Sequence, residues 1–367
     1  MKIGTVKELL DKEYRVGLTP QTTLKYVESG HEVYIESNAG LNAGFTNEDY
    51  IKAGAQILNT AEDVWNTVDL LVKVKEPIPS EYQYFRKNLA VFSYLHLSSH
   101  RDLLDAFVKN NTTAIAYETV QLDNKKLPCL EPMSGIAGRV AVLEGSRFMQ
   151  SAFNGPGKLI SGTDGVDPAT TVIIGAGNAG LGALELAVGL NSNVIMLDIN
   201  ESRLNQIKDK FKDKVEVLIS NETNLIESLA KADLVISTVS LPGAKTPKII
   251  KRSYYKNMKK GAVIVDIAID QGGSTEVAKK MTLSDPVFVV DDIIHYAVPN
   301  MPRAVQQRST IALTNSTVEF GLEIANNGLK DLSKLSNAVK RGINVHNGII
   351  TNENVAKAFN LEAKTII

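Results

Sequence analysis

TTVIIGAGNAGLGALELAVGLNSNVIMLD, which spans residues 170–198, combines two apolar runs with a glycine-rich turn. The first run is β-branched, a segment with helical composition follows the turn, and the second run ends in Asp198. Strand, glycine turn, helix, strand and acid is the order of a dinucleotide-binding βαβ unit. The stretch therefore predicts a nucleotide-binding Rossmann domain.

Three glycines of this turn have separate roles in such a unit. Gly175 permits the tight turn, Gly177 lets the backbone approach a pyrophosphate, and Gly180 lets the helix pack closely on the strand. The amide groups and the dipole at the start of the helix offer positive potential to a diphosphate. We therefore expect the three glycines to line a cofactor site.

Asp198, at the tip of the second strand, predicts which dinucleotide is preferred. Its carboxylate can accept hydrogen bonds from both ribose hydroxyls and would repel a 2′-phosphate, which favours NAD over NADP. Arg203 follows closely enough in sequence to weaken this preference.

Composition places the chain among ordinary globular proteins. Its 367 residues suggest two domains, and hydrophobic and charged residues make up 44% and 22% of the chain. The net charge of −1 gives no reason to expect nucleic acid or an anionic membrane as a partner. Cys129 is the single cysteine, and the first residues lack the apolar core of a signal peptide, so we expect a cytoplasmic location. We expect no metal site.

Alternating strand and helix patterns extend on both sides of the glycine turn. Before it, strands are predicted at residues 2–6, 32–36, 69–75, 89–97 and 113–117, with helices at 19–29, 46–53, 60–66 and 101–110. Thr19 suits a helix cap and Pro20 a first helical turn. From the turn onwards, strands are predicted at 171–174, 194–197, 215–219, 233–237, 262–269 and 287–291, with helices at 181–190, 201–211, 224–231 and 248–258.

Two longer helices are predicted at residues 134–153, with Ser134 as a candidate cap, and at 308–326. The expected fold is α/β, with two Rossmann-like doubly wound parallel sheets joined by these helices. Residues 1–129 with 306–367 would form a substrate domain and residues 130–305 the NAD-binding domain. The active site would then lie in the cleft between them.

Two ionisable residues end predicted strands of the first domain. Ligands of open α/β sheets bind outside the carboxyl ends of strands, where Lys75 and His96 fall. His96 can exchange a proton near neutral pH, although a histidine there can equally be buried and bonded to backbone. Lys75 can polarise a carbonyl or hold a carboxylate, but Lys73 shares its face of the strand and spacing cannot choose between them.

Arg15 and Asp270 lie in predicted loops. An arginine before a helix can bind a carboxylate through two hydrogen bonds, although a solvent-exposed arginine is the commoner case. Asp270 follows an apolar strand and precedes a glycine turn, so it could bind a cation or ammonium. Asp266, in the middle of the same predicted strand, is more typical of a structural residue.

Taken together, these motifs resemble the bacterial L-alanine dehydrogenase family along essentially the whole chain. The resemblance is carried by EYRVGLTP, GHEVYIE, DLLVKVKEP, LHL, AYETVQ, the glycine loop with MLDIN, PGAKTPK, GAVIVDIAIDQGG, NMP and ALTN. It implies NAD as cofactor, L-alanine, pyruvate and ammonium as substrates, and a homohexamer.

The resemblance also implies roles for individual residues. His96 and Asp270 correspond to the catalytic histidine and aspartate, and Arg15 and Lys75 to the residues that hold the substrate carboxylate and carbonyl. The implied cofactor contacts, beyond the three glycines, are Ser134, Asn178, Ala179, Asp198, Arg203, Ser220, Val239, Ser240, Ile267, Ala268, Ile269, Asp270, Lys279, Val298, Pro299, Asn300 and Met301.

Three stretches depart from the family pattern: residues 134–139, 161–168 and 299–309. The first and third border the expected cleft and could alter cofactor affinity or substrate size. Two other interpretations remain: the nucleotide-binding subunit of a proton-translocating transhydrogenase, and a non-catalytic NAD-binding sensor. The retained Lys75, His96 and Asp270 set argues against both.

Overall fold

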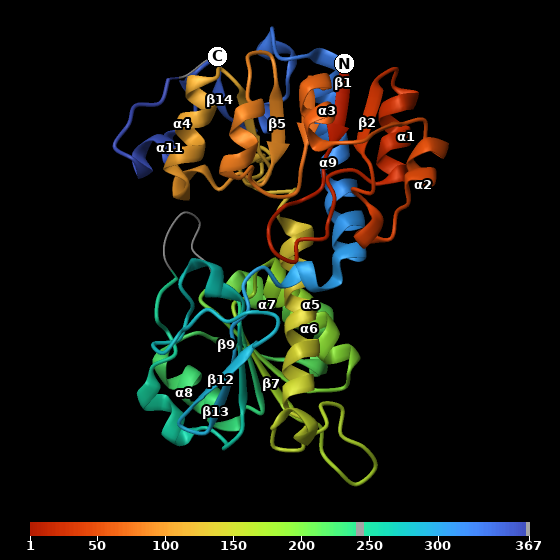
Figure 1. Cartoon of the computed structure of the whole chain (residues 1–367). Helices are drawn as coiled ribbons and strands as arrows, with labels where there is room; N and C mark the ends of the chain where they lie inside the picture. The colour runs from red at the N-terminus through yellow and green to blue at the C-terminus, as the bar shows by residue number, and fades with distance from the viewer. Residues whose placement is uncertain (240–245, 365–367) are drawn as a thin grey trace. The chain divides into compact units, whose positions relative to one another are not determined.

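The computed structural model describes residues 1–239 and 246–364. It divides into two compact units, each a sheet with flanking helices (Figure 1). Unit 1 is built from residues 1–133 and the segment that begins at Val305, and unit 2 from residues 134–304.

Unit 1 contains the strands β1 (Lys2–Thr5), β2 (Glu32–Glu36), β3 (Gln56–Leu58), β4 (Leu70–Val72), β5 (Ala90–Ser93), β6 (Thr113–Ala116), β14 (Ile343–His346) and β15 (Ile349–Ile350). Among the described residues, these eight strands form one sheet in the order β15-β14-β6-β5-β4-β1-β2-β3. Strands β1 to β6 run parallel to their neighbours among these six, whereas β14 lies antiparallel to β6 and β15 antiparallel to β14.

The α-helices assigned to unit 1 are α1 (Pro20–Glu28), α2 (Asn47–Lys52), α3 (Ala61–Thr67), α4 (Arg101–Lys109), α9 (Gln306–Asn327), α10 (Asn337–Gly342) and α11 (Glu353–Ala358). Its 3₁₀ helices are η1 (Leu41–Ala43), η2 (Pro79–Tyr84), η3 (Leu97–Ser99), η4 (Tyr117–Thr119) and η10 (Leu332–Lys334).

Three of these helices begin after a threonine cap. The side chains of Thr19, Thr46 and Thr60 each accept a hydrogen bond from the backbone N–H three residues later. Such a cap contributes about 1 kcal/mol to helix stability. The prediction of Thr19 as a cap, with Pro20 in the first turn, is confirmed.

An aromatic cluster covers one face of the sheet of unit 1. Trp65 of α3 is fully buried, with ring centroids 5.8 Å from Tyr84 and 5.9 Å from Phe85, and Phe85 lies 4.5 Å from Phe107 of α4. The same cluster includes apolar residues of β4 and β5. The carboxyl ends of these two strands are therefore fixed by a packed core.

Unit 2 contains the strands β7 (Thr170–Ile174), β8 (Asn193–Asp198), β9 (Glu216–Ile219), β10 (Leu234–Ser237), β11 (Val263–Asp266), β12 (Val287–Val290) and β13 (Ile293–Tyr296). Its helices are α5 (Glu131–Phe148, whose first three residues belong to unit 1), α6 (Asn178–Gly189), α7 (Glu201–Phe211), α8 (Glu222–Lys231), η5 (Ser151–Phe153), η6 (Lys212–Lys214), η7 (Arg252–Asn257) and η8 (Ile267–Gln271). The 3₁₀ helix η9 (Met301–Val305) crosses from unit 2 to unit 1.

The described strands of unit 2 form a seven-stranded sheet in the order β12-β13-β11-β10-β7-β8-β9. All neighbours run parallel except β12, which lies antiparallel to β13. The order reverses beside the first strand of each unit, between β1 and β4 and between β7 and β10. Ligands of such sheets bind at these switch points.

The end of the unit 2 sheet differs from prediction. The predicted last strand at 287–291 is an antiparallel edge strand, and the strand beside β11 is β13, which the pattern missed. Asp291 and Asp292 connect the two with φ values of 50° and 63°. Two residues of positive φ make a tight hairpin, which two aspartates signal less clearly than Asn-Gly.

Three other predictions of local structure are wrong. The helix predicted at 248–258 is reduced to η7, because Ile250 forms a parallel bridge with Thr275. The strand predicted at 262–269 ends at Asp266, whose side chain accepts the N–H of Ala268 at 3.1 Å and begins η8. Ser134 is no cap, because α5 begins three residues earlier.

No helix among residues 1–239 and 246–364 combines the length and the apolar character needed to span a bilayer.

Candidate active site

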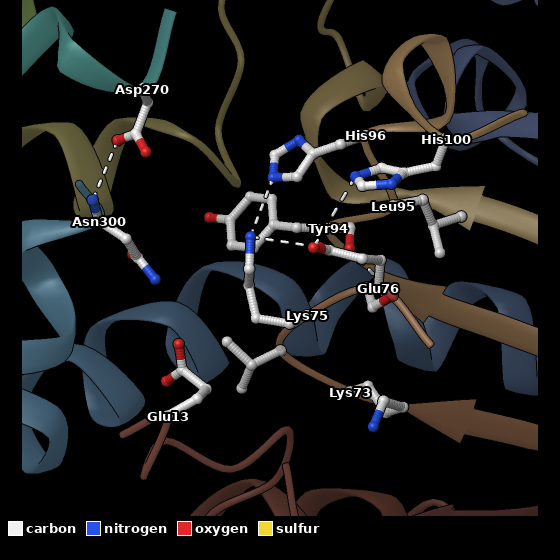
Figure 2. A network of polar contacts seen from close by, with 12 residues as sticks. Glu13, Lys73, Lys75, Glu76, Tyr94, Leu95, His96, His100, Asp270 and Asn300 are labelled. Atoms are coloured by element: carbon white, nitrogen blue, oxygen red, sulfur yellow. Dashed lines mark hydrogen bonds and ion pairs between the residues drawn. The ribbon is translucent and has the colours of Figure 1, made fainter. Parts of the chain in front are cut away.

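Lys75 and His96 occupy matching positions on neighbouring strands. Each follows the last residue of its strand by three, Val72 in β4 and Ser93 in β5, and these strands pair in parallel. Lys75 Nζ lies 3.2 Å from His96 Nε2 (Figure 2). An ammonium group donates only, so His96 Nε2 acts as the acceptor and the imidazole proton is assigned to Nδ1.

Lys73 is separated from this pair by its partners. Its side chain is 1% exposed, and Nζ lies 3.0 Å from Glu81 Oε1 and 3.5 Å from Glu8 Oε2. Glu8 also accepts the backbone N–H of Val74 at 2.7 Å, and burial raises the pKa of Glu8 although Lys73 opposes the shift. Lys73 therefore lies between two buried carboxylates, while Lys75 faces His96.

Glu76 provides a negative charge on the other side of Lys75. Its Oε2 lies 3.2 Å from Lys75 Nζ, and its Oε1 lies 4.0 Å from His100 Nε2 (Figure 2). Burial opposes ionisation, but attraction to Lys75 and His96, together with hydrogen bonds, outweighs it and lowers the pKa of Glu76. Lys75 is thus an ion-paired cation that contacts the imidazole.

His96 is half-buried and has an unusual backbone conformation. Its side chain is 41% exposed, and its φ of 46° and ψ of 37° are left-handed. The Tyr94 ring lies nearly parallel to the imidazole, with centroids 6.1 Å apart. Burial lowers the pKa of His96, Glu118 opposes the shift, and Lys75 adds to it. A histidine of lowered pKa is neutral at physiological pH and can accept a proton.

Arg15 is buried in an ion pair, so the alternative of a solvent-exposed arginine does not apply. Its side chain is 2% exposed, and Nε and Nη2 each lie 2.6 Å from an oxygen of Glu13. Nη1 donates to Met133 Sδ at 3.3 Å. Burial opposes the charged forms, but the hydrogen bonds and mutual attraction of the pair lower the pKa of Glu13 and raise that of Arg15. The guanidinium is a fixed positive charge in the loop after β1.

In unit 2, the glycine loop between β7 and α6 has the geometry of a phosphate cradle. Gly175 has a φ of 102°, and a Cβ at Gly180 would lie 1.9 Å from the Gly175 carbonyl oxygen. A Cβ at Gly177 would meet no heavy atom within 4 Å, so backbone rather than side chain faces this space. Asn178 and Ala179 begin α6, where N–H groups have no partner within the helix.

Asp198 fixes this loop from the tip of β8. Its Oδ2 accepts the N–H of Ala176 at 2.6 Å, and its Oδ1 accepts the N–H of Asn200 at 2.8 Å. Arg203 Nε donates to the Ala176 carbonyl at 3.1 Å, and the Ser220 N–H donates to the Asp198 carbonyl at 2.9 Å. Asp198, Arg203 and the glycine loop are thus joined by hydrogen bonds through Ala176.

Asp270 lies on η8, not at the end of a strand. It is exposed, and its Oδ2 accepts the backbone N–H of Asn300 at 3.0 Å (Figure 2). Asn300 has a φ of 53°. Asp266 is buried and accepts the N–H groups of Ala268 and Ser274, which agrees with a structural role.

The remaining predicted cofactor contacts occupy varied positions. Val298 and Met301 are buried, Lys279 is exposed, and Ser240 lies outside the described residues. The others are Ser134 inside α5, Val239 shortly after β10, Ile267, Ala268 and Ile269 on η8, and Pro299 beside Asn300.

Sequence reasoning missed the carboxylates that surround the predicted residues. Glu8, Glu13, Glu76 and Glu118 each contact Arg15, Lys73, Lys75 or His96, or the backbone next to them. Glu13 and Glu118 lie in the motifs EYRVGLTP and AYETVQ. The motifs alone do not show that Glu13 bonds to Arg15 or that Glu118 bonds to the backbone of His96.

Comparisons with known proteins give matches along both units. The N-terminal and C-terminal domains of the alanine dehydrogenase/PNT family match residues 4–137 and 141–353. An alanine dehydrogenase of Methanococcus maripaludis is 44% identical over 98% of this chain and 97% of its own. Alanine dehydrogenase 2 of Staphylococcus aureus is 43% identical over 100% and 98%.

Solved structures show the same similarity. An L-alanine dehydrogenase superimposes with a TM-score of 0.95 at 42% identity, covering 98% of this chain and 99% of its own. A transhydrogenase from Sinorhizobium meliloti, at a TM-score of 0.85 and 23% identity over 96% and 100%, shares the fold. With matches across both units, this chain belongs to the alanine dehydrogenase/PNT family.

Proposed function

We propose that this protein is an NAD-dependent L-alanine dehydrogenase. L-Alanine, NAD⁺ and water would react reversibly to give pyruvate, ammonium, NADH and a proton. The observation that carries the proposal is the Lys75–His96 contact of 3.2 Å at the carboxyl ends of β4 and β5. It places a cation and a proton acceptor side by side in a member of this family.

Arg15 and Lys75 are proposed to bind the substrate acid. Both are cations at the carboxyl end of the unit 1 sheet, beside the switch point between β1 and β4. Lys75 would polarise the oxygen that becomes the ketone of pyruvate, because a nearby ammonium stabilises negative charge there. Arg15 would attract the substrate carboxylate.

His96 is proposed to move the proton. In the direction of deamination, the neutral imidazole would accept a proton from the water that adds to the imine carbon, and in reverse the imidazolium would return it. Lys75 supports this role because its charge disfavours a resting imidazolium. Asp270 of unit 2 is proposed to position the water or the ammonia, and the active site in the cleft between the domains remains a prediction.

The glycine loop of unit 2 fits a dinucleotide. The open space at Gly177 and the first N–H groups of α6 suit a diphosphate, and Asp198 suits the adenosine ribose. NAD, when bound, would supply the acceptor for the hydride that leaves the alanine α-carbon. The predicted homohexamer rests on family resemblance and the predicted cytoplasmic location on the single cysteine, and both remain predictions.

The direct test is NADH oxidation with ammonium and a panel of small 2-oxo acids. Pyruvate should be reduced and aminated with the highest kcat/KM, and the product should be L-alanine by chiral chromatography. NADH binding without turnover of any 2-oxo acid would contradict the proposal and favour a sensor.

A second test concerns the choice of NAD over NADP. Asp198→Asn removes the charge but keeps an oxygen that can accept the Ala176 N–H. The ratio of NADH to NADPH affinity, measured by fluorescence titration, should fall about tenfold. A wild-type protein that prefers NADPH would contradict the role of Asp198 and favour Arg203 as a 2′-phosphate partner.

A further inference from the structure

Glu118 lies beside His96 without belonging to the predicted active-site residues. It occupies η4, directly after β6, and β6 is the neighbour of β5. Its side chain is 17% exposed. Its Oε1 accepts the His96 N–H at 2.6 Å, and both oxygens lie 3.3 Å from the Leu95 nitrogen.

These hydrogen bonds hold a backbone conformation that histidine rarely adopts. Left-handed backbone at a residue other than glycine is strained and persists where the surroundings over-determine it. A carboxylate that accepts two consecutive N–H groups provides such a constraint, because charge-assisted hydrogen bonds are stronger than neutral ones. Glu118 therefore helps to fix the direction in which the His96 side chain leaves the backbone.

The same carboxylate faces the imidazole itself. Glu118 Oε1 lies 3.9 Å from His96 Nδ1, the nitrogen opposite the one that contacts Lys75. This distance exceeds a hydrogen bond but permits electrostatic attraction. The imidazole is therefore held between a cation at Nε2 and an anion near Nδ1.

We propose that Glu118 is a positioning residue for His96. Its carboxylate holds the backbone of His96 and places a negative charge near His96 Nδ1 during proton transfer. This inference rests on the proposed dehydrogenase function. Lys75, Glu76 and His100 are the other charged or titratable groups that act on the imidazole, and the Tyr94 ring lies parallel to it. Glu118 opposes the lowering of the His96 pKa that burial and Lys75 cause.

The turn that carries Glu118 is itself anchored. Thr119 Oγ1 lies 3.0 Å from Asn344 Oδ1, 3.2 Å from the Ala116 carbonyl and 3.3 Å from the Gly342 carbonyl. These partners join η4 to α10 and β14. The C-terminal segment of unit 1 thus supports the residue that supports His96.

Two variants separate the hydrogen bonds of Glu118 from its charge. Glu118→Gln keeps an oxygen that can accept the backbone N–H groups but is neutral, and Glu118→Ala removes both. Asp123→Asn is the matched control, since it removes an exposed carboxylate that pairs with Arg341 at 2.8 Å.

Kinetics of alanine oxidation should show two separate effects. In Glu118→Ala, kcat should fall about tenfold to a hundredfold, as for other groups that orient a functional side chain, with NADH affinity within about twofold of wild type. In Glu118→Gln, kcat at its pH plateau should recover at least half of this loss on a logarithmic scale. The acid limb of kcat/KM should move to lower pH, because neutral His96 then persists to lower pH. The control should match wild type in both.

A measurement independent of turnover is the titration of His96 by NMR of ¹⁵N-histidine-labelled full-length protein, with the His96 signals identified by their loss in His96→Gln. The pKa of His96 should be lower in Glu118→Gln than in wild type and unchanged in Asp123→Asn. If wild type oxidised no alanine, the dehydrogenase function would fail, but this titration would still test Glu118. An unchanged His96 pKa in folded Glu118→Gln would overturn the proposal.

Discussion

The loops at the carboxyl ends of the parallel strands carry different chemical groups in the two sheets. In unit 1 the turns after β1, β4, β5 and β6 carry ionisable side chains, among them Arg15, Lys75, His96 and Glu118. In unit 2 the turn after β7 carries glycines and the start of α6, so it presents backbone. Proton transfer needs side chains that titrate, whereas a diphosphate can be bound by backbone N–H groups alone.

The largest expected effect would come from the histidine of unit 1. His96→Ala should lower kcat by about a hundredfold to ten-thousandfold while NADH still binds, because acid–base groups contribute that much to turnover. His31→Ala, which removes an imidazole bonded to Asn326 at 2.9 Å, is the control. Near-wild-type kcat in His96→Ala, measured by steady-state kinetics, would mean that the charged strand ends of unit 1 are structural.

A variant of Arg15 shows whether the ionisable side chains at the strand ends of unit 1 also stabilise that unit. Arg15→Ala should raise KM for pyruvate more than it lowers kcat, because a carboxylate clamp acts in ground and transition states alike. It also leaves the buried Glu13 without its cation, which should cost about 3–5 kcal/mol of unfolding free energy in urea titrations. The double variant Glu13→Gln/Arg15→Ala should recover stability but not KM. Recovery of KM as well would show that Arg15 serves only Glu13.

Gly180 is the corresponding test for unit 2. Gly180→Ala places a Cβ 1.9 Å from the Gly175 carbonyl oxygen, so the loop must shift. Overpacking of this kind costs about 1–3 kcal/mol, and NADH affinity should fall by at least tenfold in fluorescence titrations. Gly189→Ala, at the end of the same helix and with no atom within 4 Å of the new Cβ, should bind NADH like wild type. Equal affinities in the two variants would contradict the cradle.

His295 of unit 2 provides a contrast with His96. It is 2% exposed on β13, its ring stacks 4.8 Å from Phe288, and burial lowers its pKa to about 4. Below about pH 6.5 the unfolded chain binds a proton that the folded chain refuses, so stability is lost as pH falls from 6.5 towards 4. From pH 7 to pH 5 this residue should account for a loss of about 2 kcal/mol, at 1.4 kcal/mol for each pH unit.

Urea unfolding of wild type and His295→Phe at both pH values, followed by far-ultraviolet circular dichroism, checks this expectation. Wild type should lose about 2 kcal/mol more than the variant between pH 7 and 5. Equal losses in the two proteins would mean that His295 is protonated in the folded state.

Cys129 should give the smallest effect. It is buried, its Sγ lies 3.8 Å from the Ser316 carbonyl, and burial raises its pKa to about 12. A thiol of that pKa is not a nucleophile at neutral pH. Cys129→Ser should keep kcat within about twofold of wild type in the pyruvate assay. A hundredfold loss of kcat in a folded Cys129→Ser variant would show that the thiol takes part in catalysis.

Patterns local in sequence predicted the fold well. The glycine loop, the alternation of strands and helices and the Thr19 cap depend on near neighbours, and the structure confirms them. The strands that the sequence patterns missed are β3, β13, β14 and β15, of two to four residues each. Of these, β14 acquires its place by pairing with β6, more than two hundred residues away. Strand pairing of this range leaves no local pattern.

The candidate site was predictable in its members but not in its contacts. Strand ends in sequence indicated Lys75 and His96, and the family resemblance favoured Lys75 over Lys73. The ion pairs of Lys73 with Glu8 and Glu81, which separate it from His96, had no signal in the sequence. Asp270 was expected at the end of a strand, but the side chain of Asp266 begins a 3₁₀ helix that carries it further. The positions of Lys73 and Asp270 are thus determined by contacts of the side chains of Glu8, Glu81 and Asp266 with residues that are not their neighbours in a strand or helix.

The pairing of β14 with β6 has a consequence for synthesis. A ribosome releases β6 early and β14 only after all of unit 2 has emerged, so the sheet of unit 1 stays incomplete for almost the whole of translation. Unit 2, by contrast, is one continuous segment and can fold as soon as it is released. During that interval β6 presents an open edge to other chains. Premature termination near residue 304 would leave unit 2 intact and unit 1 prone to aggregation.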